Sequence, residues 1–457
     1  MKIDVLVAEI GSTTTKATAI DGIAGIPRCL GQGRAPTSVL RGDVNVGLDD
    51  AIEDLRIRLG ADRIEARETF ACSSAAGGLK MSVHGLVHDM TARAAREAAL
   101  GAGANLKLVT SGLLEDHDLK RIRALGLNIV MIAGGVEHGD RRTAIANAAA
   151  IASLRLPVPV VFAGNIDARD AVMQAFADHG MECWLTIAEN VYPRIDQLRV
   201  DDARRIIQDV FERHIIQAPG MERIRERIGG TILPTPGAVM NASLLLQKAI
   251  GDLVVADVGG ATTDIHSVTA GGAEASSRSI APEPFAKRTV EGDLGVFVNR
   301  QNLIDVLGLD RLSRDLQTNQ LELARLLETY PPIPGSAHVP LVERLTRVAL
   351  KLALDRHAGR FVDAFGTTGK ITVAEGKDLS AVKCVIGTGG ALARLPNGRA
   401  MLSDMIATDD RKRLFPPPTA ELLIDDDYVF AAAGAIAGTH PEAALALMMN
   451  SIGMKVR

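Results

Sequence analysis

Aromatic residues are scarce in this chain. They make up 3% of its 457 residues, with one Trp and three Tyr. Any core must therefore be filled mainly by Ala, Val, Leu and Ile, which belong to the 47% of the chain that is apolar. A chain of this length is long enough for two or three domains, each with its own core.

Several other absences narrow the class of protein. The four cysteines are scattered without a CxxC pair, so neither a disulfide framework nor a zinc site is indicated. No apolar run approaches the length of a bilayer-spanning helix, and Asp4 and Glu9 interrupt the first apolar stretch, unlike the core of a signal peptide. Lys and Arg number 51 against 55 for Asp and Glu, a net charge of −4, which argues against a nucleic-acid-binding face. We expect a cytoplasmic protein that binds neither nucleic acid nor membrane.

Apolar strand patterns alternate with helical patterns from about residue 67 to residue 190. The clearest strand patterns are at 107–110, 128–133, 158–163 and 182–187, and helical patterns lie between them, as at 141–154 and 168–179. This alternation predicts an α/β fold with a largely parallel sheet.

One local pattern occurs twice. An apolar run, an acidic residue, a Gly/Thr turn and a second apolar run follow one another around Glu9 and again around Asp257. The repetition predicts internal pseudo-symmetry. With the Gly/Pro-rich stretch 229–237 as the boundary, we expect domain I at 1–235 and domain II at 236–457.

The two repeated turns suit a bound phosphate, since a turn rich in Gly and hydroxyl residues presents backbone N–H groups as an anion cradle. In the first loop Lys16 adds a point charge, and in the second Asp257 has the chemistry to hold hydrated Mg²⁺. The candidate residues of the two loops are Gly11, Ser12, Thr13, Thr14 and Lys16, and Gly259, Gly260, Ala261, Thr262 and Thr263.

A third glycine-rich loop lies nearer the C-terminus. It comprises Gly387, Thr388, Gly389 and Gly390, follows the strand pattern 381–386 and precedes a helical pattern. Bare glycine backbone lets a flat ligand lie close, so we expect this loop to contact adenosine.

A single Gly/Thr turn is an ordinary hairpin, but three such loops in this order resemble the superfamily of actin, sugar kinases and heat-shock chaperone ATPases. The resemblance implies two actin-like ATPase (ribonuclease H-like) domains around a nucleotide cleft, with ATP and Mg²⁺ as cofactors. It also implies that Glu9 and Asp257 are the catalytic and metal-holding carboxylates. Glu9 stands where the superfamily usually has Asp, and its extra methylene shifts the carboxylate by roughly 1.5 Å.

Longer segments carry a more specific resemblance. The stretches CSSAAGGLKM at 72–81, DVGGATTD at 257–264 and PEPFAKRTVEGDLG at 282–295 resemble the MutL-type accessory proteins of glutamate mutase, over essentially the whole chain. The resemblance implies a slow ATPase, chaperone-like, that reactivates or protects an adenosylcobalamin-dependent mutase and has the mutase subunits as partners. Three alternatives stay open: a small-molecule kinase, an ATP-dependent amidohydrolase of the hydantoinase or oxoprolinase type, and a filament-forming actin-like protein.

Other chemically suggestive residues are expected to be structural. His84 and His88 have the i, i+4 spacing of metal ligands on a helix, but their surroundings look like a strand. Asp425 opens an acidic run that is expected to be a solvated turn. A structural loop is the favoured interpretation of Glu291 and Asp293, ahead of a nucleotide contact.

Overall fold

The computed structural model describes residues 1–38, 43–74, 79–101, 104–195, 197–215, 220–228, 232–280, 282–366 and 369–454. The chain forms two compact units. The first comprises Met1–Ala75, Ala218–Ile280 and Phe285–Arg457, and the second comprises Ala76–Gln217 and Ala281–Pro284. No helix among these described residues has both the length and the apolar character needed to cross a membrane.

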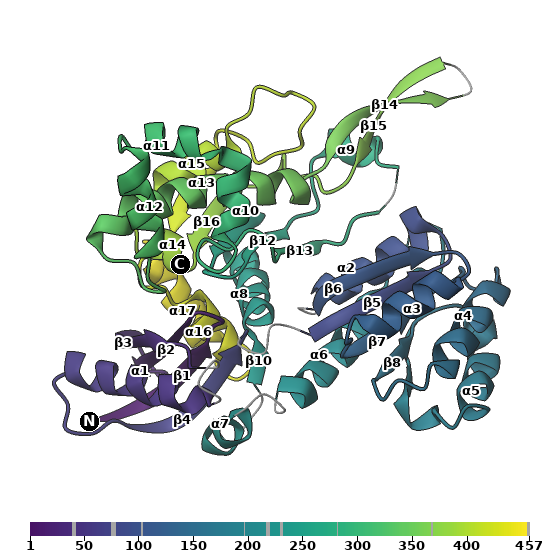
Figure 1. The fold of residues 1–457 in the computed structure, drawn as a ribbon, viewed down its shortest axis with the longest axis horizontal. Helices are drawn as coiled ribbons and strands as arrows, with labels where there is room; N and C mark the ends of the chain where they lie inside the picture. The colour runs from purple at the N-terminus through teal and green to yellow at the C-terminus, as the bar shows by residue number, and fades with distance from the viewer. Residues whose placement is uncertain are drawn as a thin grey trace. The chain divides into compact units, whose positions relative to one another are not determined.

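The first unit contains two five-stranded sheets with the same plan (Figure 1). In order across the first sheet the strands are β10 (Ile232–Pro234), β4 (Glu65–Ser73), β1 (Lys2–Ile10), β2 (Thr14–Asp21) and β3 (Arg28–Pro36). In the same sense the second sheet has β17 (Glu421–Ile424), β16 (Cys384–Thr388), β11 (Leu253–Val258), β12 (Thr263–Val268) and β13 (Ala286–Glu291).

The two sheets also agree in strand direction. In each, the central strand is antiparallel to the next strand of the chain and parallel to a later one, with another parallel strand beyond. A third strand completes an antiparallel meander in each sheet. The predicted pseudo-symmetry is therefore confirmed at the level of topology, and the fold is the expected pair of actin-like α/β domains.

A layer of helices packs against both sheets. Helices α8 (Thr235–Ile250), α16 (Phe430–Ile436) and α17 (Pro441–Ser451) share one apolar cluster with Val5 and Val7 of β1 and with Val255 of β11. The opposite face of β11, including Val254 and Ala256, packs in a second cluster with α13 (Val339–His357) and α15 (Gly398–Ile406). Successive side chains of β11 point to opposite faces of the sheet, and both faces are buried.

The remaining elements of the first unit lie around these layers. The helices are α1 (Val44–Arg58), α7 (Met221–Ile228), α9 (Ala273–Ser277), α10 (Arg300–Leu307), α11 (Leu309–Asp315), α12 (Gln320–Glu328) and α14 (Gly390–Ala393). Strands β14 (Arg360–Gly366) and β15 (Gly369–Glu375) form a separate two-stranded sheet. The α1 N-terminus is capped by the Asp43 side chain, which accepts from the Asn45 N–H.

The second unit is a parallel sheet in the order β6, β5, β7, β8, β9. Its strands are β5 (Leu79–Gly85), β6 (Ala104–Ser111), β7 (Ile129–Ile132), β8 (Val160–Phe162) and β9 (Leu185–Ile187). Its helices are α2 (Arg93–Gly101), α3 (Asp116–Ala124), α4 (Arg142–Ser153), α5 (Arg169–Ala177) and α6 (Asp201–Ile215), with a π-helix at His88–Ala92. The order is that of a doubly wound α/β sheet.

The alternating pattern read from the sequence is confirmed in this unit, with one local difference. The stretch predicted as a strand at 182–187 begins with a turn of 3₁₀ helix, Glu182–Trp184, and only Leu185–Ile187 pairs with β8. Residues 75–78 of the segment at 72–81, and residues 229–231 of the Gly/Pro-rich stretch, lie outside the described residues. The division into domains 1–235 and 236–457 stays a prediction.

Candidate nucleotide site

The first two loops adopt the same turn. The Gly11 N–H donates to the Thr14 carbonyl over 3.1 Å, and the Gly259 N–H donates to the Thr262 carbonyl over 2.9 Å. Each turn joins the central strand of its sheet to the next strand, so Glu9 pairs with Lys16 in the first register and Asp257 with Asp264 in the second. The local repetition in sequence thus corresponds to a repetition in three dimensions.

The two loops face each other. A Cβ atom added to Gly260 would lie 2.4 Å from Oγ1 of Thr13, so only a glycine permits this approach. Within the described chain, the N–H groups of Ser12, Thr13, Gly260 and Ala261 donate to no protein acceptor. Unpaired N–H groups in turns of this kind can serve as an anion cradle.

Residues just after β13 hold the second loop in place. The carbonyl of Gly260 accepts from the N–H groups of Phe297 and Val298, over 2.9 and 2.7 Å. The Thr263 hydroxyl, fully buried, donates to the Leu294 carbonyl over 2.8 Å and is therefore committed to the protein. Of the predicted loop residues, Gly259, Gly260, Ala261 and Thr262 remain partly exposed.

Asp257 is the carboxylate best placed to hold a cation. It keeps partial exposure, and within the described residues no Lys, Arg or His forms an ion pair with it. Desolvation raises its pKa to about 7, the charges of Asp264 and Glu9 add to the rise, and Lys16 and Arg288 oppose it. A carboxylate with too little positive charge around it would gain from a bound cation.

Glu9, by contrast, already has a partner. Lys16 Nζ lies 2.7 Å from Glu9 Oε1, a close ionic contact without the direction of a hydrogen bond. The same ammonium donates to the Tyr428 carbonyl over 2.6 Å and lies 3.4 Å from the centroid of the Tyr428 ring. Burial raises the pKa of Glu9, and the charge of Lys16 opposes this rise. Lys16 is 3% exposed, and its ammonium contacts protein groups on Glu9 and Tyr428.

Three charged or polar side chains lie buried on the face of the second sheet that carries Asp257. Arg288 donates through Nη2 to Oδ2 of Asp264 over 3.2 Å, and both are almost fully buried with His266. Five atoms of this cluster have no protein hydrogen-bond partner among the described residues: Asp264 Oδ1, His266 Nδ1 and Nε2, and Arg288 Nε and Nη1. An unsatisfied buried group costs about 1–3 kcal/mol, so five together rival the roughly 5–15 kcal/mol that stabilises a typical domain.

The third loop is only partly available to a ligand. Gly387 packs inside, since an added Cβ would lie 3.0 Å from Cδ1 of Ile424, and the Thr388 hydroxyl is buried and donates to Asp425 over 2.7 Å. Gly389, with φ +83°, lies directly against the second loop, and an added Cβ would lie 2.4 Å from Asp257 Oδ1. Gly390 has open space around it. The structure therefore brings the third loop against Asp257, and the second loop against Thr13 of the first.

Asp425 was wrongly predicted to lie in a solvated turn. It is fully buried and accepts from the hydroxyls of Thr388 and Ser451 and from the N–H groups of Val429 and Phe430. It thereby satisfies two N–H groups at the start of α16 and ties the third loop to that helix. The signal that was missed is its position immediately after β17 and before a helix.

The other discounted residues make contacts within the protein. Glu291 and Asp293 both accept from the Arg356 guanidinium. His84 lies in β5 between the hydroxyls of Ser82 and Thr110, whereas His88 starts the π-helix. Among the described residues, no group of three or more His, Cys, Asp or Glu is placed to hold a metal.

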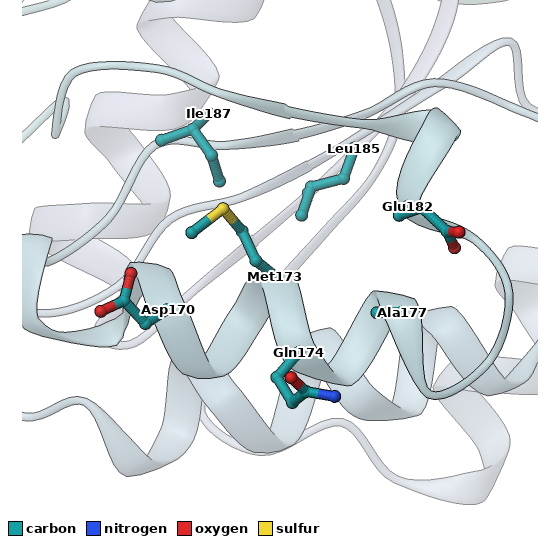
Figure 2. A pocket seen from close by; sticks show the side chains of 7 residues that line it. All are labelled: Asp170, Met173, Gln174, Ala177, Glu182, Leu185 and Ile187. Atoms are coloured by element: carbon teal, nitrogen blue, oxygen red, sulfur yellow. The ribbon is translucent and has the colours of Figure 1, made fainter.

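A surface hollow of about 410 Å³ lies in the second unit, between α5 and β9 (Figure 2). Met173 of α5 points toward Leu185 and Ile187 of β9, and Asp170 and Glu182 lie at opposite ends (Figure 2). None of the predicted site residues lines it.

The fold and the arrangement of the loops define a class of protein. Two sheets of one plan, the same Gly/Thr turn on each and a carboxylate beside each turn are the marks of an actin-like two-domain fold.

The chain belongs to the MutL family. The family model described as MutL protein matches residues 5–452. Protein MutL of Clostridium tetanomorphum is 35% identical over 463 residues, which covers 97% of this chain and 98% of that one.

Solved structures are similar only distantly. Acetone carboxylase in a nucleotide-free structure is 13% identical, with a TM-score of 0.40, covering 95% of this chain and 70% of its own. Component A of the Acidaminococcus fermentans (R)-2-hydroxyglutaryl-CoA dehydratase is 9% identical, with a TM-score of 0.31, covering 97% of this chain and 99% of its own.

Proposed function

We propose that this chain binds ATP with Mg²⁺ between the first and second loops and hydrolyses it slowly, as an accessory factor of an adenosylcobalamin-dependent mutase. The observation that carries the nucleotide part is the pair of matching turns that meet at Thr13 and Gly260. Their free N–H groups suit the phosphates. Gly389 and Gly390 suit the adenosine side of the nucleotide.

Asp257 fits a magnesium ligand. Its carboxylate is partly exposed, lacks an ion-pair partner among the described residues and lies against Gly389 of the third loop. Mg²⁺ takes one or two carboxylates and fills its other positions with water and phosphate oxygens. When bound, the ion would neutralise phosphate charge during hydrolysis. Glu9 as a second ligand stays a prediction, because Lys16 already neutralises its carboxylate.

Family membership supports the mutase part of the proposal. Hydrolysis that shifts the two actin-like domains between arrangements would supply differential binding energy toward a partner protein. The purified chain should hydrolyse ATP slowly and restore turnover to a glutamate mutase that has been loaded with inactive cobalamin. A matched reaction with a non-hydrolysable ATP analogue should restore nothing.

Two further assays separate this proposal from the kinase and filament alternatives. Rapid phosphorylation of a small metabolite would identify a kinase instead. ATP-dependent sedimentation of the chain alone would identify a filament-forming protein.

A further inference from the structure

The polar cluster beneath the second loop is not used by the proposed function. Asp264 is directly opposite Asp257 on the neighbouring strand, and His266 is directly opposite Arg288. Since residues two apart on a strand share a face, Asp264, His266 and Arg288 line the same inner face of β12 and β13. Asp257, on β11, completes that face at the edge nearest the loops.

The unpartnered atoms in this cluster include both donors and acceptors. Burial, and then the charge of Arg288, hold the pKa of His266 well below its ordinary value, so its ring is neutral with one N–H and one lone pair. Arg288 offers N–H groups at Nε and Nη1, and Asp264 offers a lone-pair oxygen at Oδ1.

This set of atoms selects the chemical class of the ligand. A metal cation would be repelled by the Arg288 guanidinium, which keeps its charge in proteins. A free anion would be repelled by the carboxylates of Asp264 and Asp257. Water both donates and accepts, and a buried water typically makes about three hydrogen bonds to polar groups of this kind.

We propose that Asp264, His266 and Arg288 bind ordered internal water beneath the second phosphate loop, and that this hydrated cluster holds the Asp257 carboxylate in position for nucleotide turnover. The second half rests on the proposed function, and the first half is independent of it. Arg288 and His266 are positioning residues, because they act on the nucleotide only through Asp264 and Asp257.

The cluster can act on Asp257 through Asp264, which lies directly opposite Asp257 on the neighbouring strand. Asp264 and Asp257 are like charges on one face, and only one atom of Arg288, Nη2, contacts Asp264 directly. Water that bonds the remaining atoms of Arg288 and Asp264 would fix the orientation of the pair, and hence the field that Asp257 experiences.

The first test measures the water itself. A crystal structure of the full chain, at a resolution that shows ordered solvent, should contain at least one water within hydrogen-bonding distance of two of the three side chains. Oxygen-17 relaxation dispersion in solution should show a long-lived water that His266→Leu removes and His266→Gln retains. His357→Gln is the matched control, because both His357 nitrogens already bond to the hydroxyls of Thr289 and Ser267 on the opposite face of the sheet.

The second test measures turnover. His266→Leu should lower kcat for ATP about tenfold at an unchanged KM, as loss of an outer-shell positioning group commonly does, whereas His266→Gln should stay within about twofold of the wild type. Thermal unfolding of each variant checks that it is folded, and the wild-type water measurement stands even if His266→Leu does not fold.

The outcomes are separable. A dry cluster, or one whose five atoms all bond to protein groups or to nucleotide, overturns the proposal. Water that is lost in His266→Leu with no change in kcat overturns the positioning half alone. Bound water in a chain that does not hydrolyse ATP supports the hydration site and refutes the proposed function instead.

Discussion

At the scale of single residues, the structure separates two carboxylates that look equivalent in the sequence. Asp257 lies beside the second loop with no ion-pair partner among the described residues, whereas Glu9 is joined to Lys16. Their positions in the two sheets are equivalent. Glu9 is neutralised by Lys16 and Asp257 is not, so we expect substitution of Asp257 to have the larger effect on ATP hydrolysis.

Replacing Asp257 by Asn should therefore separate hydrolysis from binding. We expect ATP hydrolysis to fall by at least ~10²-fold, about 2.7 kcal/mol of transition-state stabilisation, because the charge that organises Mg²⁺ is lost. ATP binding by calorimetry should survive, since the backbone N–H groups of both loops are unchanged. Asp293→Asn is the control, because Asp293 is paired with Arg356 and lies outside the loops.

The Glu9→Gln variant then decides how the two domains share the ion. A loss of hydrolysis similar to that of Asp257→Asn would show that both carboxylates serve the metal. Normal hydrolysis would leave the metal with Asp257 alone and give Glu9 a purely structural role with Lys16.

Adjacent glycines in the third loop provide a matched pair of substitutions. Gly389 has φ +83° and an added Cβ would meet Asp257 Oδ1 at 2.4 Å, whereas nothing lies within 4 Å of a Cβ added to Gly390. Gly389→Ala should weaken ATP binding at least ~10-fold, about 1.4 kcal/mol, since Asp257 must move and the backbone is strained. Gly390→Ala should bind like the wild type in the same titration. Equal affinities for the two variants would show that the third loop does not control the position of Asp257.

At the scale of elements, local patterns predicted the strands and the two repeated turns, because each is encoded within about ten consecutive residues. They did not reveal which strands are neighbours. Strand β10 pairs with β4, so that Leu233 lies opposite Cys72. Residues 76–217 of the second unit separate these two residues in the sequence, and no local periodicity encodes such a pairing. The burial of Asp425 depends in part on such distant partners, Thr388 and Ser451, although its place between β17 and a helix was a local signal.

Strand β5 of the second unit should make that unit sensitive to acid. Burial lowers the pKa of His84 to about 4 from an ordinary value of 6.5, with a small opposing effect of Asp118. Between pH 6.5 and pH 4 the unfolded chain therefore binds a proton at His84 that the folded chain does not bind. The free energy of unfolding is unaffected by His84 above pH 6.5 and declines as the pH falls toward 4. The decline attributable to His84 is roughly 3 kcal/mol.

The measurement is urea unfolding at pH 7 and pH 4.5, followed through Trp184, which belongs to the second unit. His84→Gln should flatten the pH dependence, because Gln does not titrate and still offers polar atoms to Ser82 and Thr110. An equally steep dependence in His84→Gln would assign the acid sensitivity to other groups. Glu115→Gln is a suitable control for an exposed acidic group of the same unit.

At the scale of the whole molecule, the two units have separate cores. One apolar cluster lies wholly in the second unit and includes Phe162 and Phe176, whereas the three glycine-rich loops and their supporting clusters lie in the first. A chain built in this way need not unfold in a single step. Ligand binding should then stabilise only the unit that holds the site.

The single Trp of the chain makes this expectation measurable. With ATP at about 100 times its Kd, mass action stabilises the binding unit by about 2.7 kcal/mol. Far-UV circular dichroism should show the transition of the first unit move to higher denaturant, while the Trp184 transition stays in place. Gly389→Ala, with its weakened binding, should show a smaller shift at the same ATP concentration. If the midpoint of the Trp184 transition shifts by the same amount as that of the circular dichroism signal, the two units unfold together. A nucleotide bound in the first unit would then stabilise the second unit as well.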